Sequence, residues 1–182
     1  MAFTISNFKS NLAGGGGGAK PTLYEISIKG NTQTTAYSFG PGEQILVKAA
    51  QIPGVTIGAE TVNYAGRPIK YSGKRTYENW TTTVINDESF SIRNKVMLWM
   101  TSMAGTLAGS RAVAGVGDNP VATTWKEGVA TVTQIGSGGG VARTFTLNQL
   151  WPTSIASIPV DWSADGIEEF SVEWCFDSLS AV

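Results

Sequence analysis

The side chains that carry out most protein chemistry are scarce in this sequence of 182 residues. It contains no histidine, and Cys175 is its only cysteine. Without histidine, Ser-His and Cys-His nucleophile systems and most zinc and haem sites are excluded. A single cysteine excludes an internal disulfide and a cysteine cluster for a metal. The glycine-rich segments and the acidic side chains are the remaining candidates for chemistry.

Neither glycine run has the pattern of a phosphate-binding loop. Residues 14–18 lead into Ala19-Lys20-Pro21, so they lack the Gly-Lys-Ser/Thr ending that holds a magnesium ion, and the proline opposes a following helix. Residues 136–140 lie between two predicted strands and precede no helix that would bind a pyrophosphate at its N-terminus. This second run is typical of a hairpin turn.

The acidic residues do not form a catalytic pair either. Glu168 and Glu169 are neighbours on a predicted strand and point to opposite faces, so they cannot share one site as glycosidase carboxylates do. Asp161 and Asp165 are interpreted as solvated side chains. The sequence therefore predicts that the protein is not an enzyme and has no cofactor or metal.

Charge is low overall and unevenly distributed. Charged residues make up 15% of the chain and the net charge is −1, whereas proteins that hold nucleic acid through phosphate contacts are normally basic. No lysine or arginine follows Arg143, so the last segment carries −6 and the rest +5. If the two segments form an acidic face and a basic face, head-to-tail self-association is favoured. The alternative is that the uneven charge arises by chance on a solvated surface. The acidic residues of the last segment are Asp161, Asp165, Glu168, Glu169, Glu173 and Asp177.

The length predicts one domain, 1–182, with a core of its own. Residues 1–20 are predicted to form an N-terminal arm and a glycine-rich hinge. The arm has no evident partner in the domain, so we expect it to dock on a neighbouring molecule, with a frayed terminus as the alternative. No stretch approaches the roughly 20 apolar residues of a membrane span, and no signal peptide is recognisable. The apolar residues of the arm are Phe3, Ile5, Phe8 and Leu12.

Most of the chain alternates apolar and polar residues with the period of a half-buried strand. The clearest alternation runs through residues 170–176, and another runs through residues 24–28. One helix is predicted over residues 87–104, because apolar residues recur there at three- and four-residue spacing after Asn86-Asp87-Glu88-Ser89, which supplies a possible N-cap. Further strands are predicted at 45–50, 59–64, 68–71, 79–85, 129–135, 141–147 and 158–162.

Several short segments also stand in a distinctive order. They are KAAQIPG at 48–54, TIG at 56–58, YAGRPIK at 64–70, GKRTYENWT at 73–81, VINDESFSIRN at 84–94, LWPTS at 150–154 and IEEF at 167–170. In this order and spacing they resemble the tail tube proteins of T-even-type, contractile-tailed bacteriophages. The resemblance covers nearly the whole chain and is weakest over residues 104–143.

The resemblance implies a mainly β fold of two packed antiparallel sheets, close to a barrel, with one flanking α-helix. It also implies hexameric rings that stack into a hollow conduit inside a contractile sheath, with strands of all subunits joined into one barrel, and DNA passing through into the host. The implied location is the virion tail, assembled in the cytoplasm of the bacterial host. The implied partners are further copies of the chain, the tail sheath protein, the baseplate and tail-terminator proteins, and a tape-measure protein in the lumen.

Two surfaces are predicted to serve this assembly. We expect rings to stack through the hairpin at 56–74, because aromatic and arginine side chains are favoured interface anchors; an internal hairpin is the alternative. We expect an acidic lumen wall, because a wall that DNA slides past should not bind phosphates. The expected interface residues are Tyr64, Arg67, Pro68, Lys70, Tyr71, Phe3 and Phe8, and the expected lumen residues are Asp161, Asp165, Glu168, Glu169 and Glu173.

Two other functions remain open at this point. The chain has features that also suit the tube of a bacterial contractile injection system that is not a phage. It also suits a monomeric β-sandwich carbohydrate-binding module, in which some of the six tryptophans would stack on sugars. Most of these tryptophans stand in apolar alternation, however, which points them inward.

Overall fold

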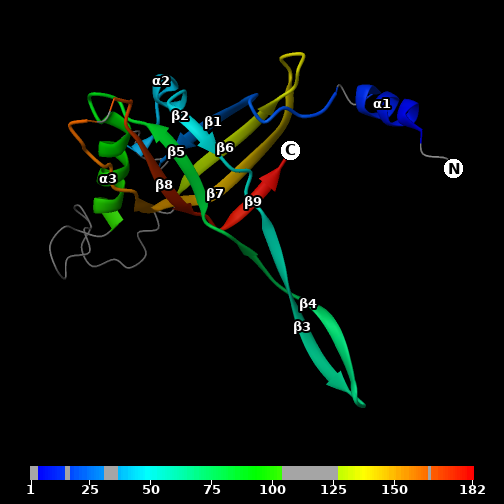
Figure 1. Ribbon diagram of the computed structural model, residues 1–182. Helices are drawn as coiled ribbons and strands as arrows, with labels where there is room; N and C mark the ends of the chain where they lie inside the picture. The colour runs from blue at the N-terminus through cyan, green and yellow to red at the C-terminus, as the bar shows by residue number, and fades with distance from the viewer. Residues whose placement is uncertain (1–3, 15–16, 31–36, 104–126, 164) are drawn as a thin grey trace.

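Antiparallel β-strands dominate the protein, as the alternation predicts (Figure 1). The structure, a computed structural model, describes residues 4–14, 17–30, 37–103, 127–163 and 165–182. The helices are α1 (Ile5–Gly14), α2 (Pro41–Gln44) and α3 (Ser91–Met103). The strands are β1 (Tyr24–Lys29), β2 (Val47–Ala50), β3 (Val55–Tyr64), β4 (Arg67–Tyr77), β5 (Trp80–Ile85), β6 (Gly128–Ile135), β7 (Val141–Ile155), β8 (Glu169–Cys175) and β9 (Ser178–Ala181).

The long strand β7 belongs to two sheets. Its first part pairs with β6 on one edge and with β9 on the other, and its second part pairs with β8. Sheet A therefore has the order β1-β6-β7-β9, and sheet B the order β7-β8-β5-β2. The change of sheet coincides with irregular backbone, since Gln149 has a φ of +59° and the register shifts between Pro152 and Ser154. One bent strand thus joins the two halves of the body.

Both sheets turn their apolar residues toward one core that is rich in tryptophan. Trp80, Trp99 and Trp174 are each at most 1% exposed. The ring of Trp174 lies 5.8 Å from that of Trp99 and 6.4 Å from that of Trp80, between centroids. Its indole N–H donates to Thr82 Oγ1 (2.9 Å), and the indole N–H of Trp80 donates to the Gln51 carbonyl (2.7 Å). Both buried donors are therefore satisfied inside the core.

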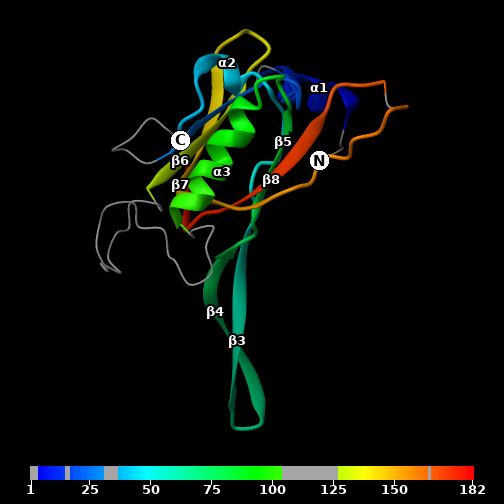
Figure 2. The ribbon, with the colours of Figure 1, turned by 90° about the vertical axis from the view of Figure 1, so that its left-hand side faces the viewer.

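Helix α3 covers one side of this core, as the view in Figure 2 shows. Its start is fixed by Asp87, whose Oδ1 accepts a hydrogen bond from the backbone N–H of Ser91 (2.9 Å). A hydrogen bond from the Ser89 hydroxyl, together with those from Ser91, holds the pKa of the Asp87 carboxyl below its usual value. The buried side chains of the helix lie at four- and three-residue spacing and are Ile92, Val96 and Trp99.

A partly buried ion pair between Lys95 and Glu43 joins α3 to α2. Lys95 Nζ lies 2.6 Å from Glu43 Oε2 and also donates to the Ser38 carbonyl (3.1 Å). The same carboxylate oxygen accepts the backbone N–H of Gly40 (2.6 Å), at the start of α2. Burial by itself raises the pKa of Glu43, but the hydrogen bonds from Lys95 and Gly40 outweigh it and hold this pKa below its usual value of 4.5.

Most predicted elements are confirmed, with shifted ends. The strands predicted at 24–28 and 170–176 are β1 and β8, and the predicted hairpin is β3–β4, whose strands extend further toward the body than expected. The helix α3 starts at Ser91, four residues after the predicted start, because residues 87–90 form its cap. Residue 104, the predicted end, lies outside the described residues. The strand β9 and the helices α1 and α2 were not predicted.

The strand predicted at 158–162 is wrong, because this segment is a loop. Pro159 has no N–H to give to a ladder, and Asp161 Oδ1 instead accepts the backbone N–H of Ser163 (2.9 Å) in a local turn. Val160 and Trp162 are 84% and 108% exposed, so the apolar alternation here has no core to meet.

Replacing Gly128 should destabilise the body. A Cβ at this position would lie against the Leu150 carbonyl oxygen and 2.5 Å from Trp99 Cη2. We expect Gly128→Ala to cost about 1–3 kcal/mol of unfolding free energy, because the core cannot yield without moving backbone. Urea unfolding followed by tryptophan fluorescence measures this cost. Gly138→Ala is the matched control, since its Cβ would meet nothing within 4 Å; an equal loss in both variants contradicts the packing argument.

The Glu43–Lys95 pair should make stability pH-dependent in the acid range. Because the folded pKa of Glu43 is lowered, its contribution is complete above 4.5 and is lost as the pH falls through the folded pKa. We expect Glu43→Gln to cost about 1 kcal/mol at pH 7 and the difference from the native chain to vanish in strong acid. Unfolding curves at several pH values measure it, with Glu88→Gln, an exposed residue, as control. A difference that is constant with pH contradicts the assignment.

Candidate assembly surfaces

The hairpin formed by β3 and β4 projects from the body in both views (Figure 1, Figure 2). Its pairing runs from Val55 and Tyr77 to Tyr64 and Arg67. The turn residues Ala65 and Gly66 have φ values of +48° and +77°, as a type I′ turn requires. Every residue of β3 is exposed. A two-stranded ribbon on its own is marginally stable in water, and the exposed part of this hairpin gains little from burial among the described residues of the subunit.

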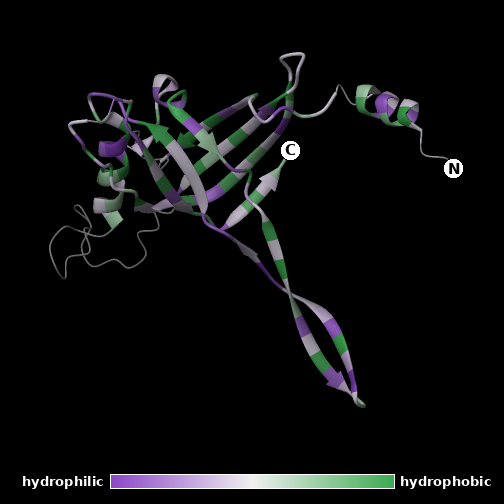
Figure 3. Cartoon of the chain, in the orientation of Figure 1, coloured by the Kyte–Doolittle hydropathy of each residue, from purple (hydrophilic) through white to green (hydrophobic). Residues whose placement is uncertain are grey.

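The register divides the outer part of the hairpin into two unlike faces, because cross-strand partners share a face. One face, which we call the tip ladder, carries the pairs Tyr64–Arg67, Val62–Ile69 and Glu60–Tyr71. The other face carries the pairs Asn63–Pro68, Thr61–Lys70 and Ala59–Ser72. The four apolar or aromatic side chains of the tip ladder are 42% to 74% exposed. Figure 3 shows the resulting mixture of hydrophobic and hydrophilic residues along both strands.

The structure separates the predicted stacking residues. Tyr64, Arg67 and Tyr71 stand together on the tip ladder, whereas Pro68 and Lys70 stand on the opposite face. Val62 and Ile69, which are not among the expected interface residues, complete the ladder between them. Counting alternate residues outward from the turn would have found both.

A second apolar patch lies nearer the base of the hairpin. Alternation along β3 places Val55 and Ile57 on the face opposite Val62. The register shifts just beyond Ile57, where a Cβ on Gly73 would lie 3.0 Å from the Gly58 carbonyl oxygen. Because Gly58 and Gly73 have no side chains, β3 and β4 can approach each other closely at this point. The hairpin therefore offers apolar surface on both faces, at different distances from the body.

Helix α1 is a further exposed surface, and none of the described parts of the subunit buries it. None of its residues is buried, and Figure 1 shows it set apart from the sheets. Ile5, Phe8 and Leu12 form a stripe at three- and four-residue spacing and are 73%, 55% and 46% exposed. Phe3, the other predicted contact of the arm, lies outside the described residues. The stripe fits the expectation that the arm docks on a neighbour.

The five predicted lumen residues do not form one uniform acidic surface. Glu169 pairs with Lys48 (2.7 Å) and Glu168 Oε2 accepts a hydrogen bond from the Asn86 amide (2.9 Å), so both are partly compensated. Glu173 is exposed on the outward face of β8. Asp161 and Asp165 lie on the loop before β8, and the Ser163 N–H and hydroxyl hold the pKa of Asp161 below its usual value. The structure thus places these residues on sheet B and its adjoining loop.

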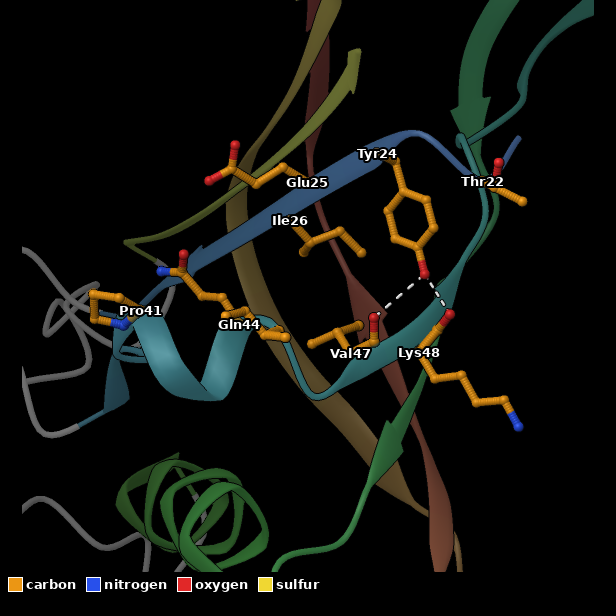
Figure 4. Close-up of a pocket in the computed structure, with 9 residues that line it drawn as sticks. Thr22, Tyr24, Glu25, Ile26, Pro41, Gln44, Val47 and Lys48 are labelled. Carbon is orange, nitrogen blue, oxygen red and sulfur yellow. Dashed lines mark hydrogen bonds between the residues drawn. The ribbon is translucent and has the colours of Figure 1, made fainter. Parts of the chain in front are cut away.

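A groove of about 560 Å³ runs between β1 and β2, where the body does not close into a complete barrel (Figure 4). The Tyr24 hydroxyl bridges it by donating to the carbonyl oxygens of Val47 (3.3 Å) and Lys48. Ile26 and Val47 form its buried floor. The groove follows the edge of β1 that no described strand covers.

These surfaces suit packing better than chemistry. Among the described residues, no three His, Cys, Asp or Glu side chains are placed to hold a metal ion. No helix of the described ranges is long and apolar enough to cross a membrane. Trp80, Trp99 and Trp174 belong to the core, so they are not available to stack on sugars.

Comparison with known sequences finds a family and individual relatives of this chain. The sequence profile of a family described as phage tail tube protein matches residues 19–181. The tail tube protein gp19 of Enterobacteria phage T4 is 26% identical over 160 residues, which cover 87% of this chain and 89% of that protein. The corresponding protein of Enterobacteria phage T6 matches equally well.

Comparison with solved structures supports the fold. A chain of the anti-feeding prophage baseplate superposes with a TM-score of 0.63 at 9% identity, covering 91% of this chain and 95% of that one. A chain of the extended sheath-tube complex of an extracellular contractile injection system, PVC, gives a TM-score of 0.56 at 10% identity and covers 100% of this chain and 99% of that one. With a family profile that spans almost the entire sequence, this chain belongs to the phage tail tube protein family.

Proposed function

We propose that the chain is the structural subunit of a contractile phage tail tube, in which six copies close a ring and rings stack into a hollow conduit for DNA. The sheath would surround this tube, the baseplate and terminator would close its ends, and a tape-measure protein would occupy its lumen. The virion tail is the proposed location, with assembly in the host cytoplasm. The support is the family membership and the likeness to phage proteins in sequence, whereas the injection-system chains are similar in fold alone.

The exposed hairpin is the observation that carries the proposal. It is a ribbon with exposed apolar patches on both faces, and it is attached to the body at its base, where the ring of Tyr77 lies 5.2 Å from that of Phe176. Exposed apolar side chains on such a projection are unfavourable in a monomer. They could instead form a contact between neighbouring rings. We propose that the tip ladder packs on the next ring, with Tyr64 and Arg67 as its anchors. Pro68 and Lys70, on the opposite face, would meet a different surface of the same neighbour.

The arm and the acidic residues have proposed places in the same assembly. Helix α1 would pack its apolar stripe against an adjacent subunit, because the described residues of its own subunit leave the stripe exposed. Asp161, Asp165, Glu168, Glu169 and Glu173 remain a prediction for the lumen wall.

Removing the tip anchors should weaken stacking without unfolding the body. We expect Tyr64→Ala with Arg67→Ala to cost about 2 kcal/mol at each contact and to raise the critical concentration for tube assembly about 30-fold. Sedimentation and negative-stain microscopy across a concentration series measure this change.

The opposite face of the same hairpin supplies the control for that experiment. Thr61→Ala with Asn63→Ala leaves the tip ladder intact and keeps Pro68 and Lys70, so the critical concentration should rise far less than in the Tyr64 and Arg67 double variant. Tubes that form from the Tyr64 and Arg67 double variant at the native critical concentration would contradict the proposed role of the tip ladder in stacking.

Changing the apolar stripe of α1 should also impair assembly. We expect Phe8→Ser to lower tube yield, because a buried phenylalanine contributes about 1.5–3 kcal/mol that serine cannot replace. The unfolding curve should not move, since α1 has no buried residue in the subunit. Ser6→Ala, on the opposite side of the helix, is the control. A lowered melting temperature with unchanged tube yield would mean that the arm serves the fold and not the assembly.

A further inference from the structure

The loop between β7 and β8 exposes large apolar side chains that the described residues of the subunit leave uncovered. Its described residues are 156–163 and 165–168. Trp162, Val160 and Ile167 are 108%, 84% and 76% exposed, and Trp162 is the most exposed large hydrophobic residue of the described ranges. Tryptophan is also among the most frequent anchors of protein interfaces. The loop therefore has the composition of a binding surface.

Hydrogen bonds hold this loop in place at its apex and at its end. Asp161 Oδ1 accepts the backbone N–H (2.9 Å) and the hydroxyl (2.8 Å) of Ser163, which closes the turn that carries Trp162. At the end of the loop, the backbone N–H of Asn86 donates to the Glu168 carbonyl (2.8 Å). The Asn86 amide also donates to the Glu168 carboxylate (2.9 Å). The apolar side chains are thus presented by an ordered loop.

The loop and the hairpin β3–β4 lie at opposite ends of sheet B. The hairpin joins the body where β5 begins, at Trp80, which pairs with Trp174. The loop leads into β8 where β5 ends, at Ile85, which pairs with Glu169. The six residues of β5 separate the two ends by about 20 Å. Both views show the loop, in orange, on the other side of the body from the hairpin (Figure 1, Figure 2).

The hairpin and the loop also carry opposite charges. The two strands of the hairpin contain four basic residues, and Glu60 is their only acidic one. The loop contains three acidic residues and no basic one. Arg93 is held at the start of the loop, where its guanidinium donates to the Ala156 carbonyl (3.1 Å) and lies over the Phe170 ring (5.4 Å). The basic residues are Arg67, Lys70, Lys74 and Arg75, and the acidic residues are Asp161, Asp165 and Glu168.

A stack that grows in one direction needs two different surfaces on each subunit. In such a heterologous contact, a patch on one copy meets an unlike patch on the next, and the contact can repeat without closing. The hairpin supplies one patch, so its receptor must be a different surface, reachable from the other end of the body. The β7–β8 loop has the position, the charge and the exposed apolar side chains that this receptor requires.

We propose that the β7–β8 loop receives the hairpin tip of a copy in the neighbouring ring, an inference that rests on the tube function proposed above. Trp162 packs against the tip ladder, where Tyr64 and the Arg67 guanidinium can stack on its indole ring. Asp165 faces the basic side chains of the hairpin, which selects the orientation of the contact more than its affinity. This placement competes with the predicted acidic lumen for Asp161 and Asp165, because side chains covered by a hairpin do not face a channel.

Cross-linking in assembled tubes tests this contact. In a Cys175→Ser background, which removes the only native cysteine, Ala65→Cys places a thiol in the hairpin turn and Asp165→Cys places one in the loop. A short bis-maleimide should join many subunits of this variant into one covalent chain, because each subunit offers one thiol to each of two neighbours. The same subunits, diluted below the critical concentration, should stay unjoined.

A matched variant and the single-cysteine variants control the cross-linking experiment. Ala65→Cys with Ser180→Cys, whose second thiol lies on β9, should give no chains. Two results overturn the inference: tubes in which the thiols at 65 and 165 react with a simple maleimide but form no chains, and dimers from Asp165→Cys alone, which would place two loops against each other. Failure of both the native chain and the Cys175→Ser parent to form tubes would instead contradict the proposed function.

The critical concentration for assembly tests the role of Trp162 without a new thiol. We expect Trp162→Ala to raise it about tenfold or more, as loss of an interface anchor does. Trp162→Phe, which keeps an aromatic ring, should recover most of the loss. The unfolding curve of either variant should not move, because this side chain is fully exposed in the subunit. A native critical concentration for Trp162→Ala would also overturn the inference.

Discussion

A two-stranded ribbon cannot bury its own side chains, and this constraint governs the molecule. The hairpin β3–β4 holds exposed apolar residues on both faces, and the stripe of α1 has no cover in its own subunit. Both features cost free energy in an isolated chain and are stable only when neighbours cover them. The family to which the chain belongs supplies such neighbours, since a tube surrounds each subunit with copies of itself.

The body supports these projections because its core is complete without them. Strand β7 runs through both sheets, so the sheets cannot slide independently, and the cluster of Trp80, Trp99 and Trp174 joins sheet B to α3. Salt bridges contribute little, as expected from a sequence with 15% charged residues. The exception is Lys95 with Glu43, which lies at the edge of the core and joins α3 to α2. Stability is thus concentrated in the body, and the surfaces for assembly extend from it.

Period-two alternation predicts strands well where both a core and a partner edge exist. It succeeds at β1 and β8, and it fails at 158–162, where Pro159 and the Asp161 turn leave apolar residues in a loop. Local sequence also places the turn of the hairpin at Ala65-Gly66, but not the length of its strands or the faces of Pro68 and Lys70, which depend on register. Helix α1 was read only as an apolar arm, since ten residues without burial give a weak helical signal.

The acidic segment shows why net charge along a sequence is a poor guide to a surface. Residues far from the acidic segment in the chain reduce the negative potential that it presents. Lys48 of β2 forms an ion pair with Glu169, and the Asn86 amide donates a hydrogen bond to Glu168. The outward side of sheet A is equally hidden in the sequence, because the row Ser27, Thr131, Thr146 and Ser180 takes one residue from each of four strands. Only the register brings Ser27, Thr131 and Thr146 side by side.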